Sequence, residues 1–221
     1  MHMIAVVDYH MGNLRSVQKG LEKVGRKAVV TSSPQKILDA QAVVLPGVGA
    51  FQDCMKNLER LGLIESIHTC LRTGKPFLGI CLGTQVLFSE GEEFGIHPGL
   101  GIIQGRVRRF PEHMTGDPRK ASGSAPVRLK VPHMGWNTIT HKKDSPLLRG
   151  IEDNSYFYFV HSYYVEPEEK DWIVATTSYG IEFASIVGKD NIIACQFHPE
   201  KSQSLGLRVL KNFGDLVSSR N

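Results

Sequence analysis

Short apolar runs that alternate with helical segments constrain the fold of this chain most strongly. The runs cover residues 3–7, 27–31 and 42–45, and the segment 14–24 carries apolar residues at helical spacing. A short helix is expected from Pro34. Strands that alternate with helices imply a parallel sheet with helices on its faces. We therefore predict an α/β fold with a mostly parallel central sheet flanked by helices.

The C-terminal half has a different pattern. Short strand-like runs at hairpin spacing cover residues 156–160, 172–177, 183–187 and 192–196. They predict additional antiparallel strands, closed by a helix whose apolar face packs on the sheet. The segment 111–126 is rich in Pro, Gly, Ser and charge, which predicts a surface insertion. The whole chain, 1–221, is expected to form a single domain, because 221 residues without repeats suit one large core.

Composition excludes several classes of function. The net charge of +4 is spread along the chain, without the aromatic-interleaved basic stripe of a nucleic-acid-binding protein. No run approaches the ~18 apolar residues of a membrane span, and no signal peptide is recognisable. Four cysteines without a Cys-x-x-Cys pair favour a reducing compartment, so we expect a cytoplasmic protein. Nine scattered histidines lack metal-ligand spacing, so neither a metal nor another cofactor is predicted.

A glycine-flanked cysteine follows the apolar run 77–80. Gly79 and Gly83 stand two residues on either side of Cys81, and Val86 to Phe88 are expected to continue into a helix. This is the cysteine form of a nucleophile elbow, a turn so tight that neighbouring side chains would clash. The helix N-terminus would favour the thiolate over the thiol. The spacing alone is equally compatible with a buried structural cysteine.

A histidine and an acid lie near the other end of the chain. His198 and Glu200 follow the strand-like run 192–196 directly. Residues two apart on an extended segment point the same way, so Glu200 could hold the imidazole that serves as base for Cys81. A structural histidine beside an acid is the alternative. The combination of these two residues with the elbow favours a cysteine nucleophile with a His–Glu base.

The segments 79–85 and 197–200 resemble the class I, or triad, glutamine amidotransferases, whose sheet has flavodoxin-like layering. Within that family, further stretches resemble the glutaminase subunits of imidazole glycerol phosphate synthases. These stretches are residues 8–13, 46–51, 132–137 and 159–163. The resemblance covers nearly the whole chain.

The resemblance implies hydrolysis of L-glutamine to glutamate and ammonia. The ammonia would pass to a partner, a (β/α)8-barrel cyclase subunit that forms a heterodimer with this chain. That partner makes imidazole glycerol phosphate and aminoimidazole carboxamide ribotide in histidine biosynthesis. No cofactor is implied.

Residue roles follow from the same resemblance. Cys81 would be the nucleophile, His198 the base and Glu200 its orienting group. The oxyanion hole would use amides of Val48 or Gly49 and of Leu82. The glutamine pocket would be lined by Gly47, Gly49, Gln85, His161, Ser162 and Tyr163. The cyclase would be contacted by His133, Met134, Gly135, Trp136 and Asn137.

Other functions are possible from the sequence. A glutaminase for anthranilate, aminodeoxychorismate or guanylate synthesis is disfavoured by the segments 46–49 and 133–137. A non-catalytic homologue that serves only as a binding module is disfavoured by the intact Cys81, His198 and Glu200. A metal hydrolase lacks support from histidine spacing.

Overall fold

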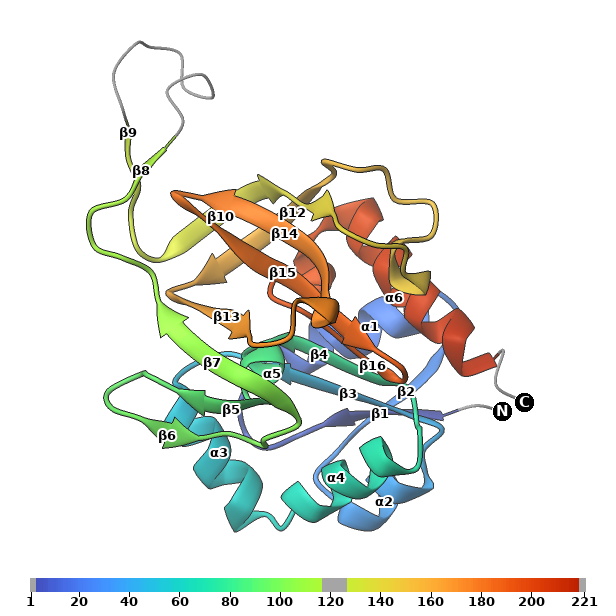
Figure 1. The fold of residues 1–221 in the computed structure, drawn as a ribbon. Coiled ribbons are helices and arrows are strands. Elements are labelled where there is room, and N and C mark those ends of the chain that lie inside the picture. Colours follow the sequence, from blue (N-terminus) through green and yellow to red (C-terminus); the bar gives the residue numbers. More distant parts are fainter. Residues whose placement is uncertain (1–2, 117–126, 219–221) are drawn as a thin grey trace.

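The computed structural model describes residues 3–116 and 127–218 of the 221-residue chain. Parallel strands form one half of its main sheet (Figure 1), in the order β2 (Lys27–Thr31), β1 (Met3–Val7), β3 (Ala42–Gly47), β4 (Phe77–Cys81) and β16 (Ile192–Cys195). The carboxyl ends of parallel strands meet at one edge, where open α/β sheets bind ligands. The last strand of the chain therefore lies beside the strand that carries Cys81.

Helices cover both faces of this parallel part (Figure 1). One face holds α1 (Leu14–Lys23) and α6 (Gln203–Ser218), and the other holds α2 (Pro34–Asp39), α3 (Phe51–Arg60) and α4 (Ile64–Arg72). Side chains along a strand alternate between the faces. Ile4 and Val6 accordingly join one apolar core, and Ala5 and Val7 join the other. The predicted parallel sheet between helical layers is confirmed.

Beyond β16 the sheet is mostly antiparallel: the C-terminal half contributes the antiparallel strands predicted for it, and residues 88–109 complete this side of the sheet. From β16 the order continues through β15 (Ile181–Lys189), β13 (Tyr163–Pro167), β7 (Ile103–Arg109), β5 (Phe88–Gly91) and β6 (His97–Pro98). β14 (Ile173–Tyr179) pairs with β15 and with β11 (Thr140–His141). β10 (His133–Thr138) and β12 (Tyr156–His161) form a separate antiparallel ribbon, near the top of Figure 1. We call this pair the β10–β12 ribbon.

Short elements complete the described chain. They are β8 (Thr115–Gly116), β9 (Val127–Arg128), η2 (Pro146–Leu148), η3 (Lys170–Trp172) and η4 (Pro199–Lys201). Residues 117–126 of the predicted insertion 111–126 lie outside the described residues. β9 pairs with β8 in antiparallel register, with Thr115 opposite Arg128 and Gly116 opposite Val127. No helix in the described part is long and apolar enough to cross a membrane.

The helix predicted after Cys81 is much shorter than expected. α5 covers only Leu82–Gln85, and Phe88 already begins β5. Val86, Leu87 and Phe88 are fully buried, and their carbonyls accept hydrogen bonds from the backbone of 100–103. A short run that is apolar on every side fits a buried strand as well as a helix, so periodicity could not separate the two. A one-turn helix has a smaller dipole than the longer helix that the sequence predicted after Cys81. It would therefore favour the thiolate less than expected.

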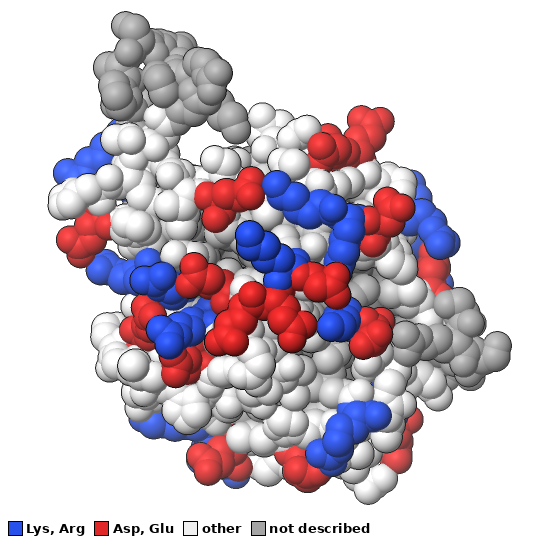
Figure 2. Space-filling view, viewed as in Figure 1, with Lys and Arg blue, Asp and Glu red and all other residues white. Residues whose placement is uncertain are grey.

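Acidic and basic side chains are mixed on the face seen in Figure 2, over the region of β5, β7 and β13. Arg106 pairs with Glu90 at 2.9 Å and Arg108 with Glu166 at 3.3 Å. These pairs are exposed and therefore contribute little to stability. Their arrangement is that of a solvated surface.

Candidate active site

Cys81 ends β4 in a strained backbone conformation. Its φ is +54°, in the left-handed region that non-glycine residues rarely adopt. A Cβ on Gly83 would lie 1.8 Å from the carbonyl oxygen of Leu45, and one on Gly79 would lie 2.8 Å from the Gly83 carbonyl oxygen. Both positions therefore require glycine. The turn is the tight elbow predicted from the sequence, pressed against β3.

His198 and Glu200 come to the same sheet edge through β16. Because β16 pairs in parallel with β4, with Cys195 opposite Ile80, the chain leaving β16 passes beside Cys81. His198 Nδ1 lies 2.8 Å from Glu200 Oε1, with the two side chains only 2% and 1% exposed. A carboxylate can only accept, so Nδ1 carries the proton and Nε2 is left as the base.

Electrostatics link this histidine to the cysteine. Burial by itself lowers the pKa of His198, but the neighbouring Cys81 thiolate and the Glu200 carboxylate outweigh it and raise the pKa to about 10. Within the described residues, His198 Nε2 has no hydrogen-bond partner of acceptable geometry. The Cys81 sulfur instead meets Val160 O at 3.9 Å and Gln196 Nε2 at 3.6 Å. The raised pKa keeps the His198 imidazole protonated at physiological pH, beside the Cys81 sulfur.

A cavity of about 500 Å³ opens at Cys81. Its lining contains most residues predicted for the oxyanion hole and the substrate pocket, namely Val48, Gly49, Leu82, Gln85, His161, Ser162 and Tyr163. Gly47, also predicted for the pocket, is not among the residues that line the cavity. A Cβ there would lie 2.3 Å from the Tyr9 hydroxyl, so glycine at this position serves packing.

Sequence reasoning missed two charged residues that line the cavity. Glu93 follows β5, and its Oε2 accepts a hydrogen bond from Phe51 N at 2.6 Å. Lys201 ends η4, with its ammonium 5.8 Å from the centre of the Tyr158 ring. Besides the Cys81 thiol, the pocket thus contains one carboxylate and one ammonium group. Lys201 follows Glu200 directly and could have been suspected, whereas nothing in the local sequence marks Glu93.

The predicted partner-facing segment divides into two faces, because side chains alternate along β10. Met134 and Trp136 are 62% and 46% exposed, and Tyr156 on the paired strand is also exposed. His133 is buried, stacked between Phe159 and Tyr179. Of the residues predicted to contact the partner, Met134 and Trp136 therefore point outward, whereas the His133 side chain points inward.

His133 and His161 form a buried pair behind the cavity. His133 Nδ1 lies 3.0 Å from His161 Nε2, and His161 Nδ1 lies 2.8 Å from the Tyr163 carbonyl oxygen. Burial lowers the pKa of His133 to about 4. Burial, with the nearby His133 and His198, lowers the pKa of His161 to about 3. Both rings are therefore neutral at physiological pH.

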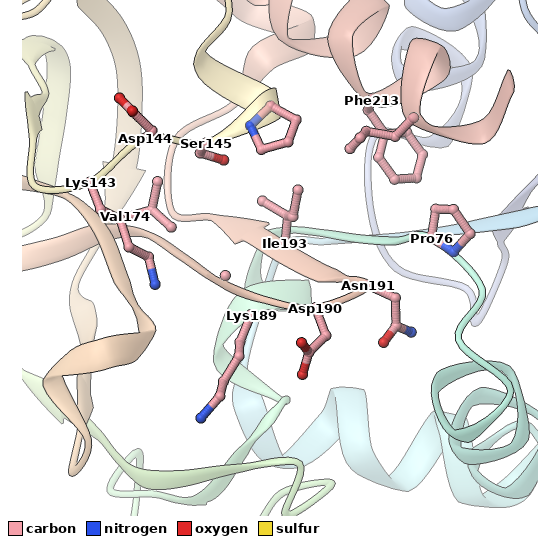
Figure 3. Close-up of a pocket in the computed structure, with 13 residues that line it drawn as sticks. Pro76, Lys143, Asp144, Ser145, Val174, Lys189, Asp190, Asn191, Ile193 and Phe213 are labelled. Atoms are coloured by element: carbon pink, nitrogen blue, oxygen red, sulfur yellow. The ribbon is translucent and has the colours of Figure 1, made fainter. Parts of the chain in front are cut away.

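A second cavity, of about 380 Å³, lies at the opposite end of β4 and β16 (Figure 3). Pro76 and Asn191, the residues just before those strands, line it. The amide of Asn191 is bonded to Leu71 O and Lys75 O, and the ammonium of Lys189 is paired with Glu169 and Asp171. Its lining contains no cysteine or histidine. The nucleophilic chemistry of the described residues is at the other edge of the sheet.

No cluster of three His, Cys, Asp or Glu side chains that could hold a metal ion occurs in 3–116 or 127–218. The four cysteines are free and buried.

Comparison with known proteins identifies the family of this chain. The family model for glutamine amidotransferase class-I matches residues 5–216. Proteins named imidazole glycerol phosphate synthase subunit HisH are similar over nearly their whole length. The one from Geobacter sulfurreducens is 54% identical over 98% of this chain and 100% of its own. The one from Geobacter metallireducens is 55% identical over 96% and 98%, and subunit HisH 1 of Methanococcus maripaludis is 49% identical over 97% and 100%.

Solved structures agree on the fold. PurLQS from Thermotoga maritima has a TM-score of 0.70 at 15% identity, covering 99% of this chain and 98% of that one. The glutaminase domain of Trypanosoma brucei CTPS has a TM-score of 0.63 at 14% identity, covering 100% and 95%. Such low identities show the fold alone. The family match and the full-length relatives go further: the chain belongs to the class-I glutamine amidotransferase family.

Proposed function

We propose that this chain is the glutaminase subunit of an imidazole glycerol phosphate synthase. It hydrolyses L-glutamine to glutamate and ammonia, and the ammonia passes to a cyclase subunit in histidine biosynthesis. The observation that carries the proposal is the buried His198–Glu200 pair beside Cys81, at the mouth of a cavity large enough for an amino acid. The full-length similarity to subunits of that synthase selects the pathway.

Acylation begins with the Cys81 thiolate. The sulfur attacks the side-chain amide carbon of glutamine, and the amide oxygen takes up the negative charge. His198, protonated because its pKa is raised to about 10, gives its Nε2 proton to the departing nitrogen. The carbon–nitrogen bond breaks, ammonia leaves, and a glutamyl thioester remains. Glu200 holds the imidazole in place and stabilises its positive charge.

Deacylation reverses the role of the imidazole. Neutral His198 takes a proton from water, and the resulting hydroxide attacks the thioester carbon. The carbon–sulfur bond then breaks, which releases glutamate and restores the thiolate–imidazolium pair. Amides of Leu82 and of Val48 or Gly49 stabilise the oxyanion in both steps. Such a donor is typically worth about 3 kcal/mol of transition-state stabilisation.

The charges in the cavity suit the two ends of a free amino acid. Glu93 would pair with the α-ammonium group and Lys201 with the α-carboxylate, because charge-assisted hydrogen bonds are the strong ones. Gln85, His161, Ser162 and Tyr163 line the remaining wall. These contacts would fix the side-chain amide over Cys81, which is the positioning that a covalent step needs.

The β10–β12 ribbon is the proposed contact with the cyclase, a (β/α)8 barrel, in a heterodimer. Met134, Trp136 and Tyr156 leave large apolar side chains exposed there, together with the Gly135 and Asn137 backbone between them. Exposed apolar side chains that gather in one place mark interaction sites. A single domain spanning 1–221 is consistent with one sheet running through both halves. The buried free cysteines favour the cytoplasm.

The test is a glutaminase assay of the purified chain together with the cyclase subunit and its nucleotide ligand. Cys81→Ala should abolish glutamate release while the cyclase still works with added ammonia. Cys70→Ala, which changes a buried cysteine in α4, is the matched control and should retain activity. Retention of glutaminase activity by Cys81→Ala would disprove the assignment of the nucleophile.

A second experiment tests the pathway. The gene for this chain should rescue a histidine auxotroph that lacks the corresponding subunit. Failure to rescue, combined with an active Cys81-dependent glutaminase, would move the chain to the amidotransferase of another pathway, such as guanylate synthesis.

A further inference from the structure

A buried glutamine donates a hydrogen bond to the nucleophile. Gln196 Nε2 lies 3.6 Å from the Cys81 sulfur, and its side chain is fully buried. The residue follows β16 directly, two positions before His198. The reaction steps derived above give it no role. A buried amide that meets a thiolate nevertheless has a consequence, because hydrogen bonds to a charged group are stronger than neutral ones.

The orientation of this amide is fixed by its neighbours. The Tyr163 carbonyl oxygen can only accept, so the group of Gln85 that lies 3.0 Å from it must be the donor Nε2. The same Nε2 lies 3.2 Å from Gln196 Oε1 and donates its second hydrogen there. Gln196 therefore turns its own Nε2 toward the sulfur. Flipping either amide would place two acceptors or two donors against each other.

A second series of hydrogen bonds ends on the Tyr163 carbonyl oxygen. His161 Nδ1 must carry the hydrogen that Tyr163 O accepts, so its Nε2 is an acceptor. His133 Nδ1 donates to that Nε2, and Asn137 Nδ2 donates to His133 Nε2 at 3.2 Å. Asn137 Nδ2 also bonds the Ser178 carbonyl oxygen at 3.0 Å, which fixes this end of the chain. The donor and the acceptor of each hydrogen bond between the Ser178 carbonyl and the Tyr163 carbonyl are thus determined.

We propose that Gln196 is a positioning residue that holds the Cys81 thiolate for attack, and that Gln85, itself fixed by the Tyr163 carbonyl, orients the Gln196 amide. The hydrogen bonds from Asn137 on β10 through His133 and His161 end on the same carbonyl and hold it in place. The proposal rests on the proposed function, since it assigns Gln196 to the same glutaminase reaction. The neutral state of both histidines keeps the direction constant, because an imidazolium could not accept at Nε2.

The fixed direction gives a spectroscopic test on the unaltered protein. Protonated and unprotonated ring nitrogens have separate ¹⁵N chemical shifts, so NMR of the ¹⁵N-histidine-labelled chain identifies each tautomer. We expect the Nδ1–H tautomer at both His133 and His161 at neutral pH. An Nε2–H tautomer or a charged ring at either residue would overturn the arrangement of hydrogen bonds that ends on the Tyr163 carbonyl.

Kinetics test the role of Gln196 itself. Gln196→Met keeps the shape of the side chain but removes the donor. In the complex with the cyclase, it should lower the glutaminase kcat about tenfold to a hundredfold, the worth of a hydrogen bond to a charged group. KM for glutamine should stay within about twofold, because the bond is to the nucleophile and not to bound substrate. Alkylation of Cys81 by iodoacetamide should slow in parallel.

Two comparisons make the outcome decisive. Gln35→Met, an exposed glutamine on α2, is the matched control and should behave as the unaltered chain. If Gln196→Met retains full kcat and alkylation rate while Cys81→Ala is inactive, the positioning proposal is overturned and the proposed function stands. If Cys81→Ala is active, the proposed function fails first. If Gln196→Met does not fold, Gln196→Glu takes its place: its carboxylate keeps the size of the side chain and still accepts from Gln85 but cannot donate to the sulfur, so the same losses are expected and full kcat would overturn the proposal.

Discussion

Acidification should destabilise this protein through its buried histidine pair. Burial lowers the pKa of His133 to about 4, and burial with the neighbouring imidazoles lowers that of His161 to about 3. The unfolded chain therefore takes up protons at these residues before the folded one does. Their contribution to stability is complete above a pH of about 6.5 and is lost as the pH falls from there toward the folded pKa values.

The magnitude follows from proton linkage. Between pH 7 and pH 5, an unfolded histidine of ordinary pKa becomes almost fully protonated, whereas His133 and His161 stay neutral in the fold. Each should cost about 2 kcal/mol over this interval, or about 4 kcal/mol together. His198 acts oppositely, because its pKa is raised to about 10; its stabilisation is complete below a pH of about 6.5 and lost as the pH rises through 10. From pH 7 to pH 5 it adds about 1 kcal/mol, so the net loss is about 3 kcal/mol.

Urea unfolding at pH 7 and pH 5 measures this difference. His133→Phe is the matched variant, since a phenyl ring can keep the stack on Phe159 and Tyr179 without titrating. It should be less stable at both pH values, because His161 loses a hydrogen-bond donor, but its acid-linked loss should be about 2 kcal/mol smaller. Equal stability of the unaltered protein at the two pH values, or an equal acid-linked loss in the variant, would refute the reasoning.

Three further changes have defined outcomes. Gly83→Ala should lower the free energy of unfolding by about 3 kcal/mol or more, because its Cβ would lie 1.8 Å from a carbonyl of β3; Gly62→Ala, in open space but at φ +64°, should cost about 1 kcal/mol. If urea unfolding gives both variants the same loss of unfolding free energy, the clash at Gly83 is not the cause. Cys81→Ala should lower the pKa of His198 from about 10, as followed by NMR titration, because the thiolate that raises it is gone; an unchanged pKa would mean that another group holds the proton. Glu93→Gln should raise KM for glutamine about tenfold with kcat within about twofold, the signature of lost substrate binding, and a fall in kcat alone would place Glu93 in the chemistry instead.

The sequence predicted those parts of the fold that depend on local pattern. Strands with continuous apolar runs, such as 42–45 and 77–80, have to be buried on both faces, and a parallel sheet between helices is the arrangement that does this. The elbow was equally predictable, because the requirement for glycine at 79 and 83 is steric and local. The structure brings Cys81, His198 and Glu200 to one edge of the sheet, and their roles remain predictions until tested.

Features that depend on distant packing could not be predicted. The direction of the His133 side chain is set by Phe159 and Tyr179, which follow it by 26 and 46 residues. Val86 to Phe88 carried no periodicity that could distinguish a strand from a helix. Gln196 directly precedes Phe197 and His198 and could have been suspected from that place. Its role, however, depends on which way an amide turns, and only the hydrogen bonds of Gln85 decide that.

The pairing of β4 with β16 has a consequence for the timing of synthesis. The strand that ends in Cys81 leaves the ribosome long before the segment that carries His198, by roughly ten seconds at ordinary translation rates. Until β16 adds to the sheet, the cysteine has neither its imidazole nor the Gln196 amide, and the cavity lacks its wall from β12 and β13. If these groups act as proposed, a nascent chain should release no ammonia. The glutaminase becomes competent only when almost the whole polypeptide has been made.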